Sequence, residues 1–213
     1  MAAFFAWPGW RHLAYAWTLS LANGAWFALV FYGCDLASAH RQLRVRVHFD
    51  AELSIPFVPA MTVVYSSLYL LFLAVPFVLR TRREIRAAVA TMAVAIGIGA
   101  AGFLLLPAQV AFAPVEEETL GRWEGLYRLA DRLNLTYNLV PSLHVALTVI
   151  CSAILARRAA PWGKVALWTW AGAVAASTVL THQHHVVDVA TGWLLAIACV
   201  RLVNDRMQRA AGR

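Results

Sequence analysis

The stretch THQHHVVDVATGWLLAIACV, Thr181–Val200, combines a polar start with an apolar continuation. Its first part carries three histidines and one aspartate, and the rest is apolar enough to enter a membrane. Ionisable side chains at membrane depth are costly, and they generally face a cavity or a partner rather than lipid. The stretch therefore predicts a membrane-spanning helix whose polar start faces a functional site.

The whole chain has the composition of an integral membrane protein. Of its 213 residues, 61% are apolar and only 14% are charged. A soluble domain is nearer half apolar, with about a quarter of its residues charged. We interpret residues 1–213 as a single integral-membrane domain.

Six apolar runs have a length of roughly 17–25 residues, which is enough to cross a bilayer. Because the unpaired backbone groups of an open sheet edge are too costly in lipid, we expect an all-α bundle of six transmembrane helices. The third run is long and contains Pro107, so we expect it to tilt, kink or end early. The expected spans are Leu13–Gly33, Phe57–Leu79, Ala87–Phe112, Leu139–Ala156, Lys164–Leu180 and Val186–Val203.

The basic residues indicate how these helices are oriented. Most of the 18 lysines and arginines lie at the two termini and in the connections after the second and fourth spans, on one side of a six-span chain. Lysine and arginine mark the cytoplasmic side, so both termini are expected there. The basic clusters then serve topology and contact with anionic lipid, and no nucleic-acid partner is expected.

The motif NLVPSLHVA opens the fourth span at the opposite, outer face, where the sixth span also begins. Pro141 suits the first position of a helix, and the free N–H groups of Ser142 and Leu143 would then point outward. Such a helix N-terminus binds anions, phosphate included, and His144 stands in its first turn. The alternative is a helix start signal followed by a histidine that is satisfied by a neighbouring helix.

His184 and Asp188 are four residues apart, which puts them one turn apart on one face of a helix. A carboxylate bonded to one imidazole nitrogen fixes the tautomer and leaves the other nitrogen free to act. Asp188 is the only acidic residue within the six spans, so it needs a partner. His182 and His185 point elsewhere on a regular helix, where polar packing at the interface is the simpler interpretation.

Together these side chains supply the groups for phosphoryl transfer through a phosphohistidine. His184 would attack phosphorus, Asp188 would orient its ring, and His144 would protonate the departing alkoxide. Ser142 and nearby backbone N–H groups would stabilise charge on the equatorial oxygens. This chemistry calls for no metal and no other cofactor.

The chain resembles the membrane branch of the type 2 phosphatidic acid phosphatase superfamily. The second motif of that superfamily, Pro-Ser-x-His, is matched by Pro141–His144, and its third motif is matched at Ser177, His184 and Asp188. The segment ELSIPFVPAMTVVYSS, Glu52–Ser67, is similar to the subgroup that contains inositol phosphorylceramide synthase-like enzymes and bacterial lipid phosphatases. The resemblance implies six transmembrane helices and the same roles for the two histidines and the aspartate.

Two phosphate-clamping arginines of the superfamily are absent. The segment PAQVAFAP, which ends at Pro114, occupies the place of the first motif, with Gln109 and Ala113 where basic residues are usual. In the third motif, Thr178 follows Ser177 where arginine is usual. Without the clamp a dianionic monoester is held less well, which gives weight to transfer from a phosphodiester.

Arg122 and Arg128 lie in the same outer loop and are the candidate substitutes for the clamp. They join Ser142 and Ser177 as the expected substrate-binding residues. The spacing of these arginines is equally consistent with a solvated amphipathic helix.

We therefore expect a metal-independent enzyme of the bacterial inner membrane that hydrolyses a lipid phosphate at its periplasmic, outer face. The substrate is a phospholipid or an isoprenoid or sphingolipid phosphate, and the sequence does not choose among them. One alternative is transfer of a phospho-headgroup to another alcohol, as in inositol phosphorylceramide or sphingomyelin synthases. Another class is a metal-binding protein that uses His182, His184, His185 and Asp188 as ligands, and a further one is a scaffold without catalysis.

Overall fold

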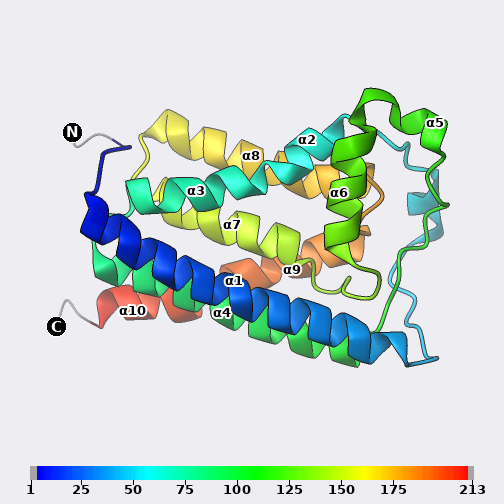
Figure 1. Cartoon of the computed structure of the whole chain (residues 1–213), viewed down its shortest axis with the longest axis horizontal. Coiled ribbons are helices and arrows are strands. Elements are labelled where there is room, and N and C mark those ends of the chain that lie inside the picture. The colour runs from blue at the N-terminus through cyan, green and yellow to red at the C-terminus, as the bar shows by residue number, and fades with distance from the viewer. Residues whose placement is uncertain (1–3, 211–213) are drawn as a thin grey trace.

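The computed structural model describes residues 4–210, and all regular structure in that range is helical. The all-α prediction is confirmed. Most of the long helices run along one axis, and the first and last described residues lie at the same end (Figure 1). The helices are α1 (Trp10–Ala39), α2 (Met61–Ser66), α3 (Leu68–Val78), α4 (Arg82–Leu105), α5 (Glu117–Leu120), α6 (Glu124–Asn134), α7 (Leu143–Ala156), α8 (Pro161–Leu180), α9 (Val186–Cys199) and α10 (Asp205–Arg209).

Among the described residues, four helical segments are long and apolar enough to cross a membrane, as in an integral membrane protein. They are α1, the α2–α3 segment Met61–Val78, α4, and the α9–α10 segment Val186–Arg209. The apolar α7 has 14 residues, so at about 1.5 Å per residue it falls short of a hydrocarbon core of roughly 30 Å. The helix α8 has 20 residues, but Lys164 and its tryptophans lower its hydropathy. The structure therefore supports four of the six expected spans by length and composition.

Two expected spans differ from the structure in more than the position of their ends by a few residues. The second is interrupted at Ser67, which separates α2 from α3. The third was expected to reach Phe112, but α4 ends at Leu105. Leu106 precedes Pro107, and a residue before proline is driven away from the helical conformation. The chain therefore leaves the bundle there and continues as an irregular connection.

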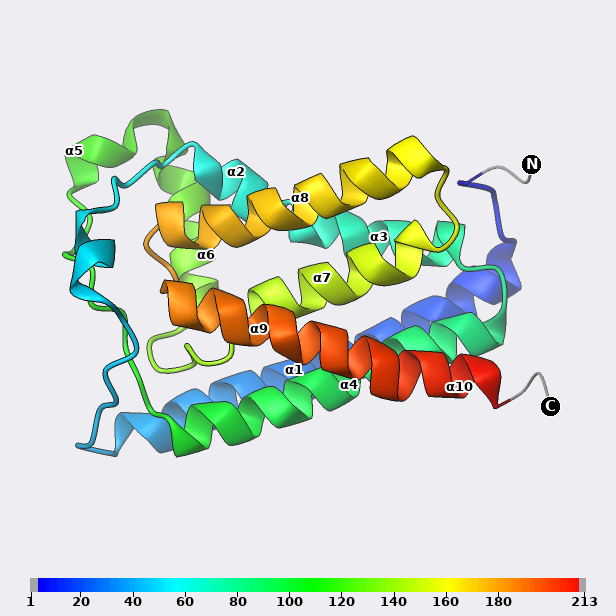
Figure 2. The same cartoon turned by 180° about the vertical axis from the view of Figure 1, so that it is seen from behind.

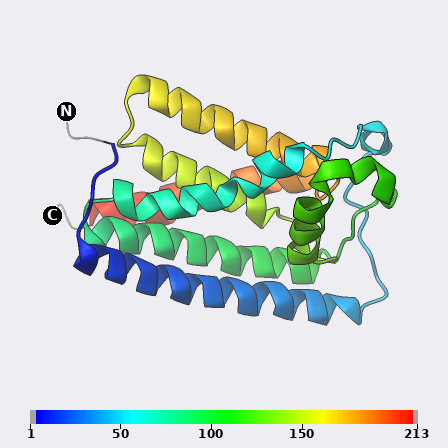
Figure 3. The same ribbon diagram turned by 45° about the horizontal axis from the view of Figure 1, so that its top comes forward.

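The helix α7 is the centre of the bundle. It packs against α3, α4, α8 and α9, and nearly all of its residues are buried. Seen from behind, α7 lies between α8 and α9 (Figure 2). The long helices α1 and α4 pack together along the other side of the bundle (Figure 3).

The end of the bundle away from the termini carries α5, α6 and the long connections (Figure 1). There α6 lies across the ends of the long helices, next to α5 (Figure 3). The connection after α1 contains a 3₁₀ turn, Asp50–Ser54, and Gly121–Trp123 forms another before α6. The starts of α7 and α9 lie at this same end (Figure 1).

The starts of α7 and α9 are in direct backbone contact. The Ser142 N–H donates to the Asp188 carbonyl over 3.0 Å. A Cβ atom at Gly192 would lie 2.4 Å from the Ser142 carbonyl oxygen, which is closer than any side chain tolerates. Small residues allow helices in membranes to approach in this way. Glycine at this position is therefore a requirement of the α7–α9 crossing.

We predict that Gly192→Ala forces these helix starts apart and lowers the free energy of unfolding by about 1–3 kcal/mol, the usual cost of overpacking. The matched control is Gly172→Ala in α8, where an added Cβ meets nothing within 4 Å. Alanine there should stabilise the helix by up to about 1 kcal/mol. Thermal unfolding in detergent compares the two variants, and equal unfolding temperatures would contradict this account of the crossing.

Candidate active site

The turn between α8 and α9 positions His184. The backbone N–H groups of Gln183 and His184 both donate to the Thr178 carbonyl over 3.0 Å. His182 adopts a left-handed backbone conformation with φ of 56°. The helix α9 begins only at Val186, so His184 precedes the helix. The expectation that His184 and Asp188 share a regular helix is thus wrong, although the two side chains meet.

Asp188 joins His184 to the start of α9. Its Oδ2 accepts a hydrogen bond from Nδ1 of His184 over 3.3 Å and from the His185 N–H over 2.8 Å. Both side chains are buried, His184 with 2% and Asp188 with 0% of its surface exposed. An ionised carboxylate can only accept, so it holds the proton on Nδ1 and leaves Nε2 of His184 unprotonated. In the neutral ring that nitrogen has a free lone pair, so it can act as a nucleophile.

The start of α7 differs in detail from the sequence expectation. Ser142 is the N-cap, and its Oγ accepts from the Val145 N–H over 3.3 Å. Pro141 therefore stands before the cap, joined to Val140 by a cis peptide bond, and does not occupy the first helical position. The expected free N–H of Ser142 is also not free, because it donates to the Asp188 carbonyl.

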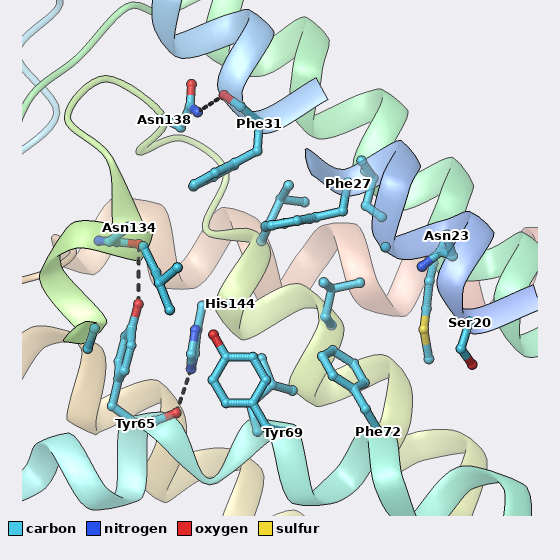
Figure 4. A pocket seen from close by; sticks show the side chains of 18 of the residues that line it. Ser20, Asn23, Phe27, Phe31, Tyr65, Tyr69, Phe72, Asn134, Asn138 and His144 are labelled. Carbon is cyan, nitrogen blue, oxygen red and sulfur yellow. Dashed lines mark hydrogen bonds between the residues drawn. The ribbon is translucent and has the colours of Figure 1, made fainter. Parts of the chain in front are cut away.

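His144 is held by Tyr65 in two ways. Its Nε2 lies 2.7 Å from the Tyr65 carbonyl oxygen, and the two rings stack with centroids 3.8 Å apart (Figure 4). A carbonyl oxygen can only accept, so Nε2 carries the proton. The remaining nitrogen, Nδ1, is then the position for proton exchange.

Both histidines line one cavity of about 420 Å³. The described residues of its wall carry no aspartate, glutamate, lysine or arginine. Aromatic and aliphatic side chains from α1, α3, α4 and α7 make most of the wall, and Phe27, Phe31 and Phe72 project into the space beside His144 (Figure 4). The site is thus a pair of imidazoles at one part of an uncharged, largely apolar chamber.

The other residues expected to bind substrate lie away from this wall. Arg122 packs over the Trp123 ring, 4.7 Å from its centroid. Arg128 forms ion pairs with Glu117 at 2.6 Å and Glu124 at 2.8 Å. Neither arginine is among the residues that line the chamber, and Arg128 borders a separate cleft of about 290 Å³. Arg128 lies in the amphipathic helix α6, and Arg122 lies in the 3₁₀ turn before it. Their positions in and next to this helix account for their spacing.

Ser177 is fully buried, and its Oγ donates to the Val174 carbonyl over 2.7 Å within α8. It does not line the chamber. Thr178, which stands where arginine is usual, also turns its hydroxyl to a carbonyl of its own helix, that of Ala175. The third motif thus contributes His184 and Asp188 to the site, with Thr178 acting through its backbone.

The three neighbouring histidines take separate partners. His182 bonds through Nε2 to the Ile55 carbonyl over 3.0 Å. His185 bonds through Nδ1 to Glu52 over 3.1 Å. Within residues 4–210, no three histidine, cysteine, aspartate or glutamate side chains gather in the way that would hold a metal ion. The divergence of these rings gives each histidine its own environment.

Sequence reasoning missed two residues that contact the site. Tyr65 holds His144, and Glu52 holds His185. Both belong to ELSIPFVPAMTVVYSS, the segment Glu52–Ser67 that resembles a subgroup of the superfamily. That resemblance was the available signal, but nothing in the spacing connects this segment to histidines far along the chain.

The fold and the site define an α-helical integral membrane protein with two histidines and a histidine-bound carboxylate at one apolar chamber. A comparison with protein families matches residues 46–202 to the PAP2 superfamily. The chain belongs to this superfamily, that of the type 2 phosphatidic acid phosphatases. This membership supports a phosphatase-type enzyme. Neither the curated proteins nor the solved structures give a significant match.

We predict that Ser142→Ala lowers the free energy of unfolding by about 1 kcal/mol, because it removes the N-cap of α7. The matched control is Ser152→Ala in the same helix. The Ser152 hydroxyl is buried without a hydrogen-bond partner within the described structure, so its removal should be neutral or stabilising. Thermal unfolding of both variants in detergent measures the difference, and a Ser142→Ala variant as stable as the wild type would refute the capping role.

Proposed function

We propose that this protein hydrolyses a lipid phosphate through a phosphohistidine intermediate at His184. The observation that carries the proposal is that His144 and His184, which lie 40 positions apart in sequence numbering, line the same chamber. Membership of the PAP2 superfamily supports the phosphatase chemistry. The geometry supports the distribution of roles between the two imidazoles.

The first step transfers the phosphoryl group to the enzyme. Nε2 of His184 attacks phosphorus while the bond from phosphorus to the lipid oxygen breaks. Asp188 keeps its hydrogen bond to Nδ1–H and stabilises the positive charge that forms on the ring. Protonated His144 gives its Nδ1 proton to the departing alkoxide, and its Nε2–H stays bonded to the Tyr65 carbonyl.

The second step releases phosphate. Neutral His144 accepts a proton from a water molecule, and the water oxygen attacks the phosphoryl group. The bond between phosphorus and Nε2 of His184 breaks as the new bond to oxygen forms. Inorganic phosphate leaves, and both imidazoles are back in their starting protonation states. The Ser142 hydroxyl, two residues before His144 in the chain, remains the candidate donor to the equatorial oxygens, although Ser142 is fully buried and is not among the residues that line the chamber.

The chamber supports a lipid as the substrate. Its volume of about 420 Å³ lies within the roughly 300–1,000 Å³ of small-molecule sites. Polar groups near His144 come from Tyr65, Tyr69 and Asn134, whereas the space beside α1 and α4 is lined mainly by apolar side chains, with Ser20 and Asn23 of α1 at one side (Figure 4). A phosphate at the imidazoles would leave its alkyl chain in the apolar part, where each buried methylene contributes about 0.8 kcal/mol.

Six spans with both termini in the cytoplasm agree best with this site. In that arrangement α7 and α8 are the two remaining spans. Because α7 is buried among other helices, it need not be as long as the hydrocarbon core is thick. The starts of α7 and α9 then face the side poor in lysine and arginine. We propose a periplasmic active site in a bacterial inner membrane.

A second candidate is transfer of a phospho-headgroup to another alcohol by the same histidines. The wall of the chamber favours it, because none of the described residues that form this wall is an arginine that could neutralise a dianionic monoester. A phosphodiester carries a single negative charge and needs less compensation. The alcohol would take the place of water in the second step.

We predict that His184→Ala lowers kcat by on the order of 10³-fold or more, since the nucleophile is lost. Asp188→Asn should lower it by on the order of 10²–10⁴-fold, because the ring loses its fixed tautomer. His40→Ala, at an exposed histidine after α1, is the matched control. The assay measures release of labelled phosphate from lipid phosphates in detergent, with alkaline trapping of the phosphoenzyme. Full turnover by His184→Ala would refute the mechanism.

The same assay separates hydrolysis from headgroup transfer. With a labelled phosphodiester lipid and candidate alcohols present, free phosphate supports the phosphatase. A headgroup-exchanged lipid that depends on His184 supports the transferase and would replace the first proposal.

We predict that Gly24→Leu raises KM for long-chain lipid phosphates and leaves short-chain substrates unaffected. Gly24 in α1 lines the chamber and has no atom within 4 Å of an added Cβ, so a larger side chain occupies space meant for an alkyl chain. Gly33→Leu on the same helix is the control, since Gly33 is equally open and is not part of the wall. Equal kinetics of the two variants on long-chain substrates would argue against the chamber as the lipid site.

A further inference from the structure

Glu52 is a carboxylate that the mechanism above does not use, yet it is almost fully buried, with 5% of its surface exposed. It lies in the 3₁₀ turn of the connection after α1. Its Oε2 accepts from Nδ1 of His185 over 3.1 Å and from the Val186 N–H over 3.0 Å, and its Oε1 accepts from the Phe49 N–H over 3.3 Å. A buried carboxylate bonded to this extent has a defined position.

Between them, Asp188 and Glu52 hold three consecutive residues, 184–186. Asp188 binds the ring of His184 and the backbone N–H of His185. Glu52 binds the ring of His185 and the backbone N–H of Val186. Each carboxylate therefore takes one imidazole and the backbone amide of the next residue. The backbone that carries the nucleophile is fixed from two sides, one of them contributed by a distant segment.

The ring of His185 is fixed on its other edge as well. Its Nε2 accepts from the Ala111 N–H over 3.1 Å, and the Phe112 ring stacks on it with centroids 4.7 Å apart. The His48 ring lies 5.1 Å away. Burial lowers the pKa of His185, and the nearby carboxylates of Asp188 and Glu52 act in the opposite direction. With a donor facing Nε2, the ring is neutral and carries its proton on Nδ1, toward Glu52.

We propose that Glu52 is a positioning residue for His184, acting through His185 and the start of α9. This assignment rests on the proposed function and adds a residue from outside the superfamily motifs to it. Removing the carboxylate frees the His185 ring and the Val186 amide. The direction of Nε2 of His184 then becomes less well defined, and a misaligned nucleophile reacts more slowly.

If Glu52 positions His184 in this way, its loss changes kcat and KM differently. Glu52 and His185 are not among the residues that line the chamber, so they do not contact the bound lipid chain. Loss of Glu52 should therefore lower kcat and leave KM nearly unchanged. A residue that only supported folding would reduce the amount of folded protein but not the turnover of each folded molecule.

The experiment compares Glu52→Ala with Asp50→Ala, a matched carboxylate of the same turn. Asp50 is exposed and pairs with Arg46 at the surface, so its loss should change little. For Glu52→Ala we expect kcat per folded molecule to fall on the order of 10- to 100-fold, as when other partners that orient a functional imidazole are lost. Phosphoenzyme formation in a single turnover should slow by the same factor.

Two further variants keep the test decisive. Glu52→Gln preserves an acceptor for the His185 ring and should recover part of the loss, and it carries the test if Glu52→Ala does not fold. His185→Ala should lower kcat as Glu52→Ala does, and the double variant should be little worse than either, because both changes break one interaction.

The outcomes distinguish the two proposals. If the wild type traps phosphate on His184 and Glu52→Gln and Glu52→Ala keep the wild-type kcat, or change only KM, the positioning role is overturned alone. If the wild type traps no phosphate, or His184→Ala remains active, the proposed function fails and the role of Glu52 fails with it.

Discussion

A carboxylate buried at the start of α9 needs hydrogen-bond donors, and the site is organised around this requirement. Asp188 meets it through Oδ2, which accepts from the His184 ring and the His185 amide, whereas its Oδ1 is buried without a partner in the described structure. The backbone carbonyl of Asp188 receives the Ser142 N–H. One residue thereby fixes the tautomer of His184 and ties the two motif-bearing helices together. The glycine one turn further along α9 lets the helices approach closely enough for that contact.

In the proposed function, the phosphate group lies in an environment without arginine or lysine side chains among the described wall residues of the chamber. Charge on the phosphoryl oxygens must then be balanced by the imidazolium of His144, the charge formed on His184 and the polar groups at the start of α7. Low polarity strengthens these interactions, since few waters compete with them. Arg128 instead pairs with carboxylates and Arg122 packs over an aromatic ring, both at the surface. A site of this kind suits a substrate of low charge.

Several local expectations held, and others failed for identifiable reasons. The apolar runs predicted helices, and Pro107 accounts for the early end of α4. Pro141 looked like the first residue of a helix, but Ser142 is the better cap, so the proline stands before it. His184 and Asp188 were expected on one helix, yet the turn that begins at Thr181 holds His184 outside α9. Short-range spacing identifies which side chains meet more reliably than it identifies the backbone conformation that brings them together.

The sequence by itself determined the helical membrane class, the candidate catalytic trio and its superfamily, because hydropathy and motif spacing are properties of contiguous residues. Only the tertiary structure decided that His144 and His184 face one chamber, that Arg128 is committed to surface carboxylates, and that Glu52 reaches His185. These facts depend on how segments far apart in the chain pack. A hydrogen bond across 133 positions has no local pattern to reveal it, because its geometry is fixed by the packing of the whole bundle.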